Sequence, residues 1–274
     1  MAKITELINK SKFSFSFEIT PDILQSNWEN VGVEPMFYSV TWHAKSHENK
    51  GLDIPPLKLA KLLRSKNKNV LLHLTCDLLE KEYTQKLLVL LQDIGICNLF
   101  VMLGENYDKS KSDFKTTEEL IKFIRKETAD YFCIGVAGFL DSGEEKFESL
   151  KRKIDAGADF VITQAFFESN HYNNFVERCK NANLTTPVIP GVFYFETYHQ
   201  FNNFVNLCKI HVSQSFNNYV KNESEKISSC PLITEELLRS LNTVSEVNHF
   251  HFFTLNKLSI ICPLISKLKE DLRN

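Results

Sequence analysis

Residues 13–19 read FSFSFEI, and the fold can be worked out from this stretch. Aromatic and small polar side chains alternate along it, and a period of two predicts a β-strand with two different faces. The three phenylalanines share one face, which we expect to pack outward under helices. The two serines and Glu18 share the other face. Glu18 therefore stands at the carboxyl end of the first strand.

Seven further apolar runs of strand length follow, rich in β-branched and aromatic residues. They cover residues 36–41, 70–75, 98–103, 132–138, 159–163, 187–192 and 249–255. Stretches with a helical period lie between them, such as Lys81–Ile94, Thr117–Thr128 and Glu145–Ala156. Strand–helix alternation repeated eight times predicts parallel strands, and 274 residues suit one closed (β/α)8 barrel of the TIM type. We expect residues 1–274 to form this single domain, with the serines and Glu18 pointing into the barrel.

Two places depart from this rhythm. The stretch Pro21–Glu34 is short for a packed helix and has room for about two turns around Ile23–Trp28. Between the last two predicted strands, by contrast, helical patterns cover Tyr198–Cys208, Ser213–Lys221 and Thr234–Glu246. We therefore expect a shortened first helix and extra helices between strands 7 and 8.

Composition excludes several classes of protein. The net charge is −2, from 32 basic and 34 acidic residues, so no basic excess indicates nucleic acid or an anionic membrane as a partner. The seven cysteines form no C-x-x-C pair and do not cluster with histidine, which predicts buried reduced thiols and no metal site. The N-terminus lacks an apolar signal core, and no apolar run is long enough to span a membrane. These features predict a cytoplasmic protein, and the 22 phenylalanines are read as core.

Four residues near predicted strand ends could carry chemistry. Partial burial of Glu18 would raise its carboxyl pKa and suit a general acid, although a structural ion pair with a barrel Lys or Arg is the alternative. His73 is either a satisfied core residue or a catalyst. Gly104 allows a ligand to approach the backbone, or only serves a turn. Gln164 can both donate and accept hydrogen bonds with a heterocycle.

The polar stretch Glu105–Thr117 follows strand 4, on the face where barrel enzymes hold their sites. It is either a solvated loop or a flap over the site. The chain contains no P-loop, G-x-G-x-x-G, H-E-x-x-H or G-x-S-x-G motif, which counts against phosphoryl transfer and against serine or zinc hydrolysis.

Several segments, in order, resemble the catalytic barrel of the methylenetetrahydrofolate reductase family. The matching segments are FSFEITP (15–21), SVTWHA (39–44), LLHLTC (71–76), GVAGF (135–139), LKRKIDAGADFVITQAFFE (150–168), TPVIPGVF (186–193) and HFHFFTLNK (249–257). The resemblance spans nearly the whole chain, and SVTWHA is similar to the eukaryotic members. Those members usually carry a C-terminal regulatory domain that binds S-adenosylmethionine. The chain ends before such a domain, so the resemblance implies no such regulation here.

The resemblance implies a flavoprotein oxidoreductase of folate one-carbon and methionine metabolism. Family members bind FAD at the top of the barrel, reduce it with NADPH or NADH, and convert 5,10-methylenetetrahydrofolate to 5-methyltetrahydrofolate. The family's catalytic glutamate falls on Glu18, which would protonate the folate, and Gln164 falls on a glutamine that contacts folate and nicotinamide in turn. The family's flavin contacts fall on Thr41, Trp42, Ala44, His73, Gly104 and Lys153, and Thr41 is also a nicotinamide contact.

The chain departs from the family mainly around FAD. The family's Arg-Gly-Asp reads Leu103-Gly104-Glu105, which loses a cation near the flavin diphosphate; Glu105 keeps the acid beside flavin and pterin. The family's Tyr-Ala in the flap helix falls on Thr116-Thr117. A tyrosine after strand 5 becomes Phe139, the acid that holds adenosine becomes Lys146, and the loop between them is shorter. The folate-binding Tyr and Arg become Phe253 and Lys257.

Two functions follow from this pattern. The first is a folate reductase with a weakened FAD site, acting on a folate substrate. The second is a barrel that has lost flavin chemistry and serves as a structural or binding subunit of a larger assembly. In the first case a homo-oligomer is common in the family, but no sequence feature stands out as an interface.

Overall fold

The computed structural model describes residues 2–8, 13–43, 51–104, 107–225 and 229–271. Its single sheet is all parallel, with the strand order β7-β6-β5-β4-β3-β2-β1-β9-β8. The strands are β1 (Ser14–Ile19), β2 (Tyr38–Val40), β3 (Val70–Thr75), β4 (Asn98–Met102), β5 (Cys133–Gly138), β6 (Phe160–Thr163), β7 (Val188–Ile189), β8 (Gly191–Phe193) and β9 (His249–Phe253). Each predicted run forms a strand, with ends that differ by at most two residues.

The seventh predicted strand is interrupted at Pro190, which has no N–H to donate. On one side of it, β7 pairs with β6; on the other, β8 pairs with β9. The Pro190 carbonyl accepts from the His251 N–H at 3.0 Å, and the Gly191 N–H donates to Thr163 Oγ1 at 2.9 Å. One chain segment thus joins both edges of the sheet and nearly closes it. The predicted (β/α)8 barrel is confirmed, with its seventh strand in two parts.

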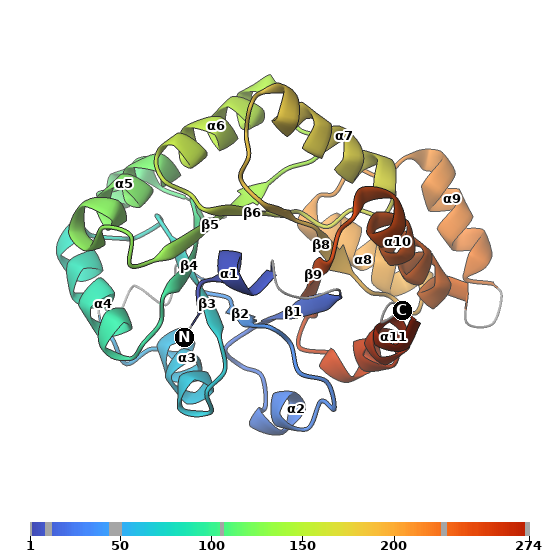
Figure 1. Ribbon diagram of the computed structural model, residues 1–274, viewed down its shortest axis with the longest axis horizontal. Helices are drawn as coiled ribbons and strands as arrows, with labels where there is room; N and C mark the ends of the chain where they lie inside the picture. The colour runs from blue at the N-terminus through green and yellow to red at the C-terminus, as the bar shows by residue number, and fades with distance from the viewer. Residues whose placement is uncertain (1, 9–12, 44–50, 105–106, 226–228, 272–274) are drawn as a thin grey trace.

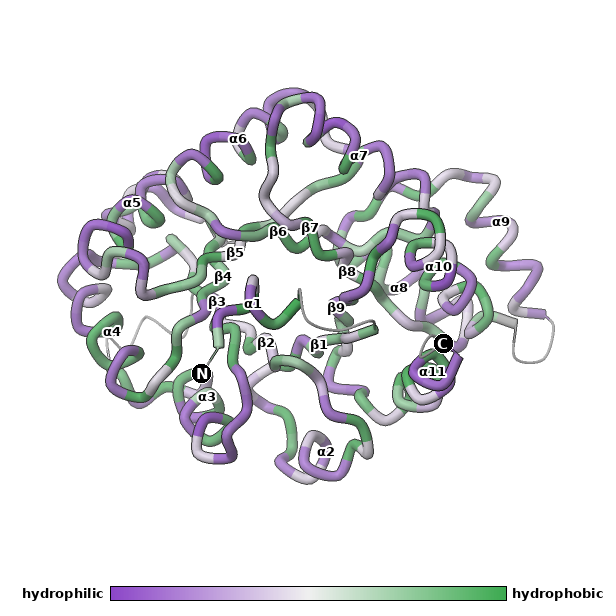
Figure 2. The backbone as a smooth tube through the Cα atoms, in the orientation of Figure 1, coloured by the Kyte–Doolittle hydropathy of each residue, from purple (hydrophilic) through white to green (hydrophobic). Residues whose placement is uncertain are grey.

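Most of the helices form a ring around the strands, whereas α1 (Ile4–Ile8) lies over the centre of the barrel (Figure 1). The other helices are α2 (Gln25–Glu29), α3 (Pro55–Ser65), α4 (Lys81–Asp93), α5 (Thr117–Thr128), α6 (Glu144–Asp155), α7 (Ser169–Asn181), α8 (Tyr198–Cys208), α9 (Gln214–Glu223), α10 (Ser229–Ser245) and α11 (Leu258–Asp271). Figure 2 shows hydrophilic and hydrophobic positions alternating along the outer helices, as expected for elements with one face on the barrel. As predicted, α2 is short, and α8, α9 and α10 are the extra helices.

The two faces of β1 point as the sequence predicts. Phe15 and Phe17 are buried among the helices, and the ammonium of Lys269 on α11 lies 4.7 Å from the centre of the Phe15 ring. The serines of β1 lie inside the barrel and bond to histidines of β9. An apolar cluster fills the rest of the bore, and Ile4 of α1 belongs to it. Because the Ile4 N–H donates to Asn98 Oδ1 at 2.9 Å, α1 is held against the strand-start end of the barrel.

A second aromatic cluster lies under the extra helices. Phe193 of β8 stacks on Phe204 of α8 with ring centres 3.7 Å apart, and Phe167 packs edge-on against Phe201. This cluster and the main core account for most of the phenylalanines. The cysteines are all free thiols, and most are buried. Among the described helices, none combines the length and apolar character that a membrane crossing needs.

Candidate active site

Glu18 is the acidic side chain at the mouth of the barrel. It lies at the carboxyl end of β1 between Ser39 of β2 and Phe253 of β9, the residues that pair with it in the sheet. The side chain is partly exposed at the mouth, and desolvation by the surrounding barrel raises the pKa of its carboxyl from 4.5 to about 7. Within the described part of the chain, the carboxyl makes no hydrogen bond or ion pair. A structural pair with a lysine or arginine is therefore absent from these residues, and the geometry suits a proton donor near neutral pH.

Two threonine hydroxyls near Glu18 lack partners. The Oγ1 atoms of Thr41, after β2, and Thr75, at the end of β3, are buried without a hydrogen bond to any described residue. An unpaired buried hydroxyl costs about 1–3 kcal/mol, so such atoms are well suited to a bound polar ligand. Thr75 was not among the predicted site residues, although it follows His73 by two on the same strand face. Trp42, beside Thr41, is buried.

His73 lies one inward position below Thr75 and is satisfied by the protein itself. Its Nε2 is 2.7 Å from Ser39 Oγ, and its ring packs against Phe100 at 5.1 Å. Burial lowers the pKa of His73 to about 3, so the ring is neutral. This environment matches the core alternative, and a ligand would meet only the edge of the ring, because 6% of the residue is exposed.

Gly104 provides close access to the backbone at the end of β4. Its φ is +110°, and a Cβ placed there would lie 2.9 Å from the Cβ of Asp77, so a side chain is strained on both counts. On the neighbouring side, α6 directs the buried Lys153 to the end of β5, where its ammonium donates to the Ala137 carbonyl at 3.3 Å. Burial lowers the pKa of Lys153. The Lys153 ammonium and the backbone of Gly104, which no side chain covers, thus lie near the mouth.

The remaining predicted site residues lie at different places around the mouth and differ in their contacts. The amide of Gln164 donates to the Cys208 carbonyl at the end of α8, at 2.6 Å, so it would have to leave this bond to contact a substrate. The ring of Phe253 covers Gly191, where a Cβ would lie 2.6 Å from it. Lys257 is exposed in the turn after β9. The predicted residues Ala44 and Glu105 lie outside the described residues.

Two residues near the site were missed by the sequence reasoning. The Thr254 hydroxyl donates to the backbone carbonyl of Glu18 at 2.5 Å, and Asn256 Oδ1 accepts from the Thr20 N–H at 2.9 Å. Together they tie the end of β9 to the end of β1 and hold the backbone on both sides of Glu18. Their only signal was their place in the segment HFHFFTLNK.

The described part of the loop after β4 is folded back on the barrel. Ser112 Oγ donates to the Cys76 carbonyl at 2.6 Å, and Phe114 is 1% exposed. The Tyr107 hydroxyl donates to the Phe114 carbonyl at 2.8 Å. Residues 107–116 therefore form a packed rim beside the mouth.

Comparison with known proteins gives the family. A model of the family "Methylenetetrahydrofolate reductase" matches residues 3–269, nearly the whole chain.

The chain belongs to the methylenetetrahydrofolate reductase family.

The relatives differ in length from this chain. It is 30% identical over 295 residues to methylenetetrahydrofolate reductase 2 of Schizosaccharomyces pombe, a match that covers 93% of this chain and 45% of that protein. It is 26% identical over 279 residues to 5,10-methylenetetrahydrofolate reductase of Escherichia coli, covering 94% and 89%. The chain thus spans about half the length of the eukaryotic relative and most of the bacterial one. A solved oxaloacetate acetylhydrolase structure superposes with a TM-score of 0.53 at 10% identity, covering 98% of this chain and 84% of that one, which reflects the barrel fold alone.

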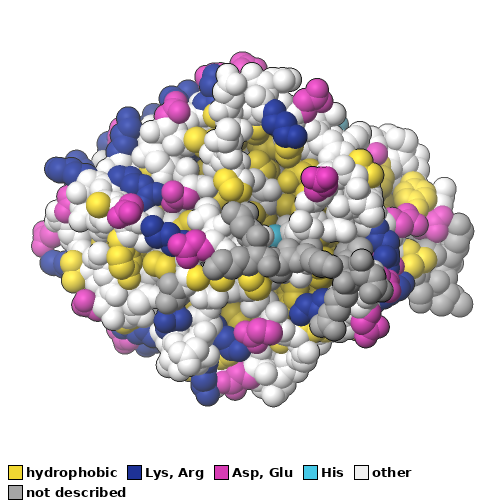
Figure 3. All heavy atoms as spheres, in the orientation of Figure 1, with side chains coloured by type: hydrophobic (Ala, Val, Ile, Leu, Met, Phe, Trp, Pro, Cys, Tyr) yellow, Lys and Arg dark blue, Asp and Glu magenta, His cyan; other side chains and the backbone are white. Residues whose placement is uncertain are grey.

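Several positions that differ from the methylenetetrahydrofolate reductase pattern lie on the β4 and β5 side of the mouth, and two others, Phe253 and Lys257, lie at the end of β9 and just after it. Leu103 is 38% exposed at the end of β4. Beyond β5, the Lys146 ammonium sits 4.7 Å from the centre of the Phe139 ring, so the two changed positions contact each other. On the opposite, strand-start face of the barrel, which Figure 3 shows, acidic and basic side chains are interspersed without a large patch of one sign.

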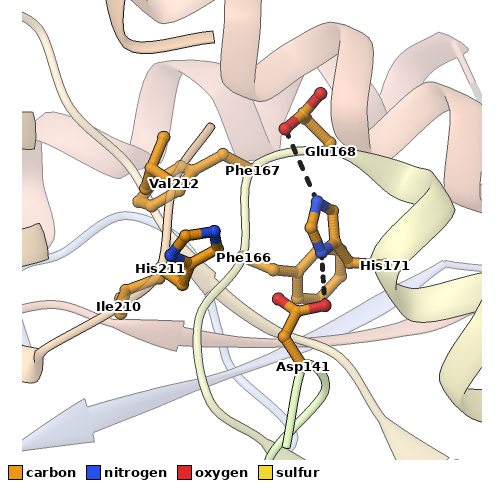
Figure 4. Close-up of a pocket in the computed structure, with 8 residues that line it drawn as sticks. All are labelled: Asp141, Phe166, Phe167, Glu168, His171, Ile210, His211 and Val212. Atoms are coloured by element: carbon orange, nitrogen blue, oxygen red, sulfur yellow. Dashed lines mark hydrogen bonds and ion pairs between the residues drawn. The ribbon is translucent and has the colours of Figure 1, made fainter. Parts of the chain in front are cut away.

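A small pocket lies at the rim near these changed positions (Figure 4). It is lined by Asp141, Phe166, Phe167, Glu168, His171, Ile210, His211 and Val212. His171 Nδ1 lies 2.6 Å from Asp141 Oδ1, and its Nε2 lies 3.5 Å from Glu168 Oε2. These contacts tie the shortened loop after β5 to the start of α7. No cluster of His, Cys, Asp and Glu among the described residues has the arrangement of a metal site.

Proposed function

We propose that this protein catalyses the flavin-dependent reduction of 5,10-methylenetetrahydrofolate to 5-methyltetrahydrofolate, with NADPH or NADH as the electron source. The observation that carries the proposal is Glu18, whose carboxyl is desolvated, with a pKa raised to about 7, at the mouth of a barrel of this family. A folate ring nitrogen must be protonated before its five-membered ring can open. Glu18 supplies that proton, because a group with this pKa is about half protonated at pH 7 and largely protonated below it.

The residues around Glu18 fit part of an FAD molecule. The unpaired hydroxyls of Thr41 and Thr75, the bare backbone at Gly104 and the Lys153 ammonium supply donors and acceptors that a flavin ring and its ribityl chain require. When bound, FAD supplies the hydride chemistry. Gln164 turns from the Cys208 carbonyl to orient the folate, with Phe253 against its ring and Lys257 near its acidic tail.

The diphosphate and adenosine parts of FAD fit less well. Leu103 offers no charge to a diphosphate, and Lys146 is positioned over Phe139 where the family has an acid. Each lost polar contact weakens binding by about 1–3 kcal/mol, so several together reduce affinity by powers of ten. We therefore propose a protein that binds FAD weakly and loses it on dilution.

The same two positions favour one alternative. If FAD binding is lost altogether, the barrel acts as a structural or binding subunit of a larger complex. Stoichiometric flavin absorbance in freshly purified protein, or recovery of activity on adding FAD, would exclude this alternative. Protein that stays colourless and inactive in excess FAD would support it.

The decisive experiment compares two activities of the purified chain in excess FAD. NAD(P)H oxidation with menadione as the electron acceptor does not need a residue that protonates folate, whereas 5-methyltetrahydrofolate formation does. We expect Glu18→Gln to keep the first within about twofold and to lose the second by about 10²-fold or more. The control Glu177→Gln, an exposed carboxyl on α7, should keep both. Absence of both activities in the unmodified chain would overturn the proposal.

A further inference from the structure

Beneath Glu18, serines of β1 and histidines of β9 form a continuous hydrogen-bonded ladder. Ser14 Oγ lies 2.8 Å from His249 Nδ1, and His249 Nε2 lies 3.1 Å from Ser16 Oγ. Ser16 Oγ in turn lies 2.8 Å from His251 Nδ1. The register of the two strands, which pairs Ser14 with His249 and Ser16 with His251, places these four residues in this order. All four are buried, and together we call them the Ser–His ladder.

If the Ser16 hydroxyl donates one of the ladder's bonds, the protons of the ladder can be arranged in only two ways. Both rings are neutral, because burial lowers the pKa of His249 to about 3 and that of His251 well below its ordinary value, and no carboxylate bonds to them. A neutral imidazole carries one N–H and one bare nitrogen, and each hydroxyl carries one proton. If all three bonds are made, every donor therefore points toward Ser14, or every donor points toward His251.

The carbonyl of Asn248 selects between the two arrangements. A carbonyl oxygen only accepts, and Ser14 Oγ donates to it at 3.3 Å. The Ser14 oxygen must then accept from His249 Nδ1–H, and the bare His249 Nε2 accepts from the Ser16 hydroxyl. Ser16 in turn accepts from His251 Nδ1–H. The His251 Nε2 is left unprotonated, and among the described residues it has no hydrogen-bond partner.

We propose that His251 is a positioning residue for Glu18: the ladder keeps its Nε2 unprotonated, and this bare nitrogen, one inward position below Glu18, favours the acid form of the carboxyl. Glu18 follows Ser16 by two residues on β1, and Phe253, which pairs with Glu18, follows His251 by two on β9. A lone pair disfavours a nearby carboxylate and can accept from a carboxylic acid, directly or through one water.

This role rests on the proposed function, because the acid form of Glu18 matters only if Glu18 is the proton donor. None of the other titratable groups on the surrounding elements bonds to Glu18 within the described residues. These groups are His43 after β2, His73 and Asp77 of the β3 end, His249 one position further down, and Lys257 after β9. Desolvation is the cause of the raised pKa of Glu18, and the ladder acts in the same direction.

The tautomer can be tested without any activity measurement. In ligand-free protein labelled with ¹⁵N-histidine, NMR should show His249 and His251 protonated at Nδ1, each signal assigned by its loss in the corresponding His→Asn variant. A His251 signal protonated at Nε2 would overturn the inference, whatever the protein catalyses.

Ser14→Ala tests the coupling to Glu18, because it removes the link to the Asn248 carbonyl. We expect His251 to become a mixture of tautomers, and the Glu18 carboxylic acid band in the infrared, assigned with Glu18→Gln, to titrate on the order of one pH unit lower. Thr84→Val, which removes a buried hydroxyl from α4, should change neither reading. An unchanged His251 tautomer and Glu18 titration in Ser14→Ala would overturn the inference. If the ladder behaves as expected but no folate is reduced, the proposed function fails alone.

Discussion

At the scale of single residues, the mouth of the barrel keeps polar groups that its own structure does not satisfy. The Glu18 carboxyl is desolvated, the hydroxyls of Thr41 and Thr75 are buried, and none of the three has a protein partner among the described residues. By contrast, His73 is bonded to Ser39. Buried polar groups are normally paired, and unpaired atoms also occur away from the mouth, at Trp28 and Thr234, so it is the position of these groups at the mouth that makes them candidates for a ligand. Folding alone would favour apolar residues at these positions.

Glu18→Gln should therefore stabilise the protein at neutral and higher pH. The folded-state pKa of about 7 lies above the ordinary glutamate value of 4.5, so the wild type loses stability as pH rises between these values. The variant lacks this loss. Its free energy of unfolding should exceed that of the wild type by little near pH 4.5 and by about 3 kcal/mol above pH 7. Urea unfolding of both proteins across this range checks it, with the exposed Glu177→Gln as control. Equal free energies of unfolding for the wild type and Glu18→Gln at about pH 8 would contradict the raised pKa of the Glu18 carboxyl.

At the scale of elements, the two halves of the mouth have diverged to different degrees. The ends of β1 and β9 are tied together by Thr254 and Asn256 and carry the family's acid. The ends of β4 and β5 carry Leu103 and the contact between Phe139 and Lys146. In the proposed function, Glu18 would act from the first half, and the FAD diphosphate and adenosine would lie on the second. The first half also carries two changed positions, Phe253 and Lys257, so the divergence affects both halves.

Leu103→Arg should restore part of the affinity for FAD. Leu103 is partly exposed at the end of β4, so a guanidinium there can reach a diphosphate without being buried. A charge-assisted contact of about 1.5–3 kcal/mol would tighten FAD binding about 10- to 100-fold. Titration of flavin fluorescence measures the Kd, and Leu103→Met controls for the loss of the branched side chain. Equal affinities for the Arg and Met variants would show that the diphosphate does not lie beside β4.

At the scale of the whole molecule, the barrel is held by more than its sheet. Pro190 divides the seventh strand, yet its carbonyl and the Gly191 N–H join both edges of the sheet. Ile4 of α1 fills the strand-start end of the bore, and the aromatic cluster under α8 and α9 supports the strand-7 side. The mouth is consequently the part of the barrel where polar groups remain available to a ligand.

FAD should stabilise the whole domain by mass action. At tenfold excess over its Kd, a ligand that binds only the folded state adds about 1.4 kcal/mol, which raises the Tm of a domain of this size by about 2–5 °C. Thermal unfolding monitored by circular dichroism at increasing FAD concentrations checks this. AMP, which lacks the flavin ring, should have little effect. A Tm that does not depend on FAD would favour the structural-subunit alternative.

The sequence by itself determined the barrel and the two faces of β1, because periodicity and the alternation of strands with helices are local properties of the chain. It also pointed to Glu18, which stands at a strand end within a family segment. Only the tertiary structure decided that this carboxyl lacks a described partner, that Thr41 and Thr75 keep unpaired hydroxyls, and that Gln164 bonds to α8. It alone also aligned Ser14 and Ser16 with His249 and His251, more than 230 residues away. Burial and hydrogen bonding between distant segments depend on strand register and helix packing, which no local pattern encodes.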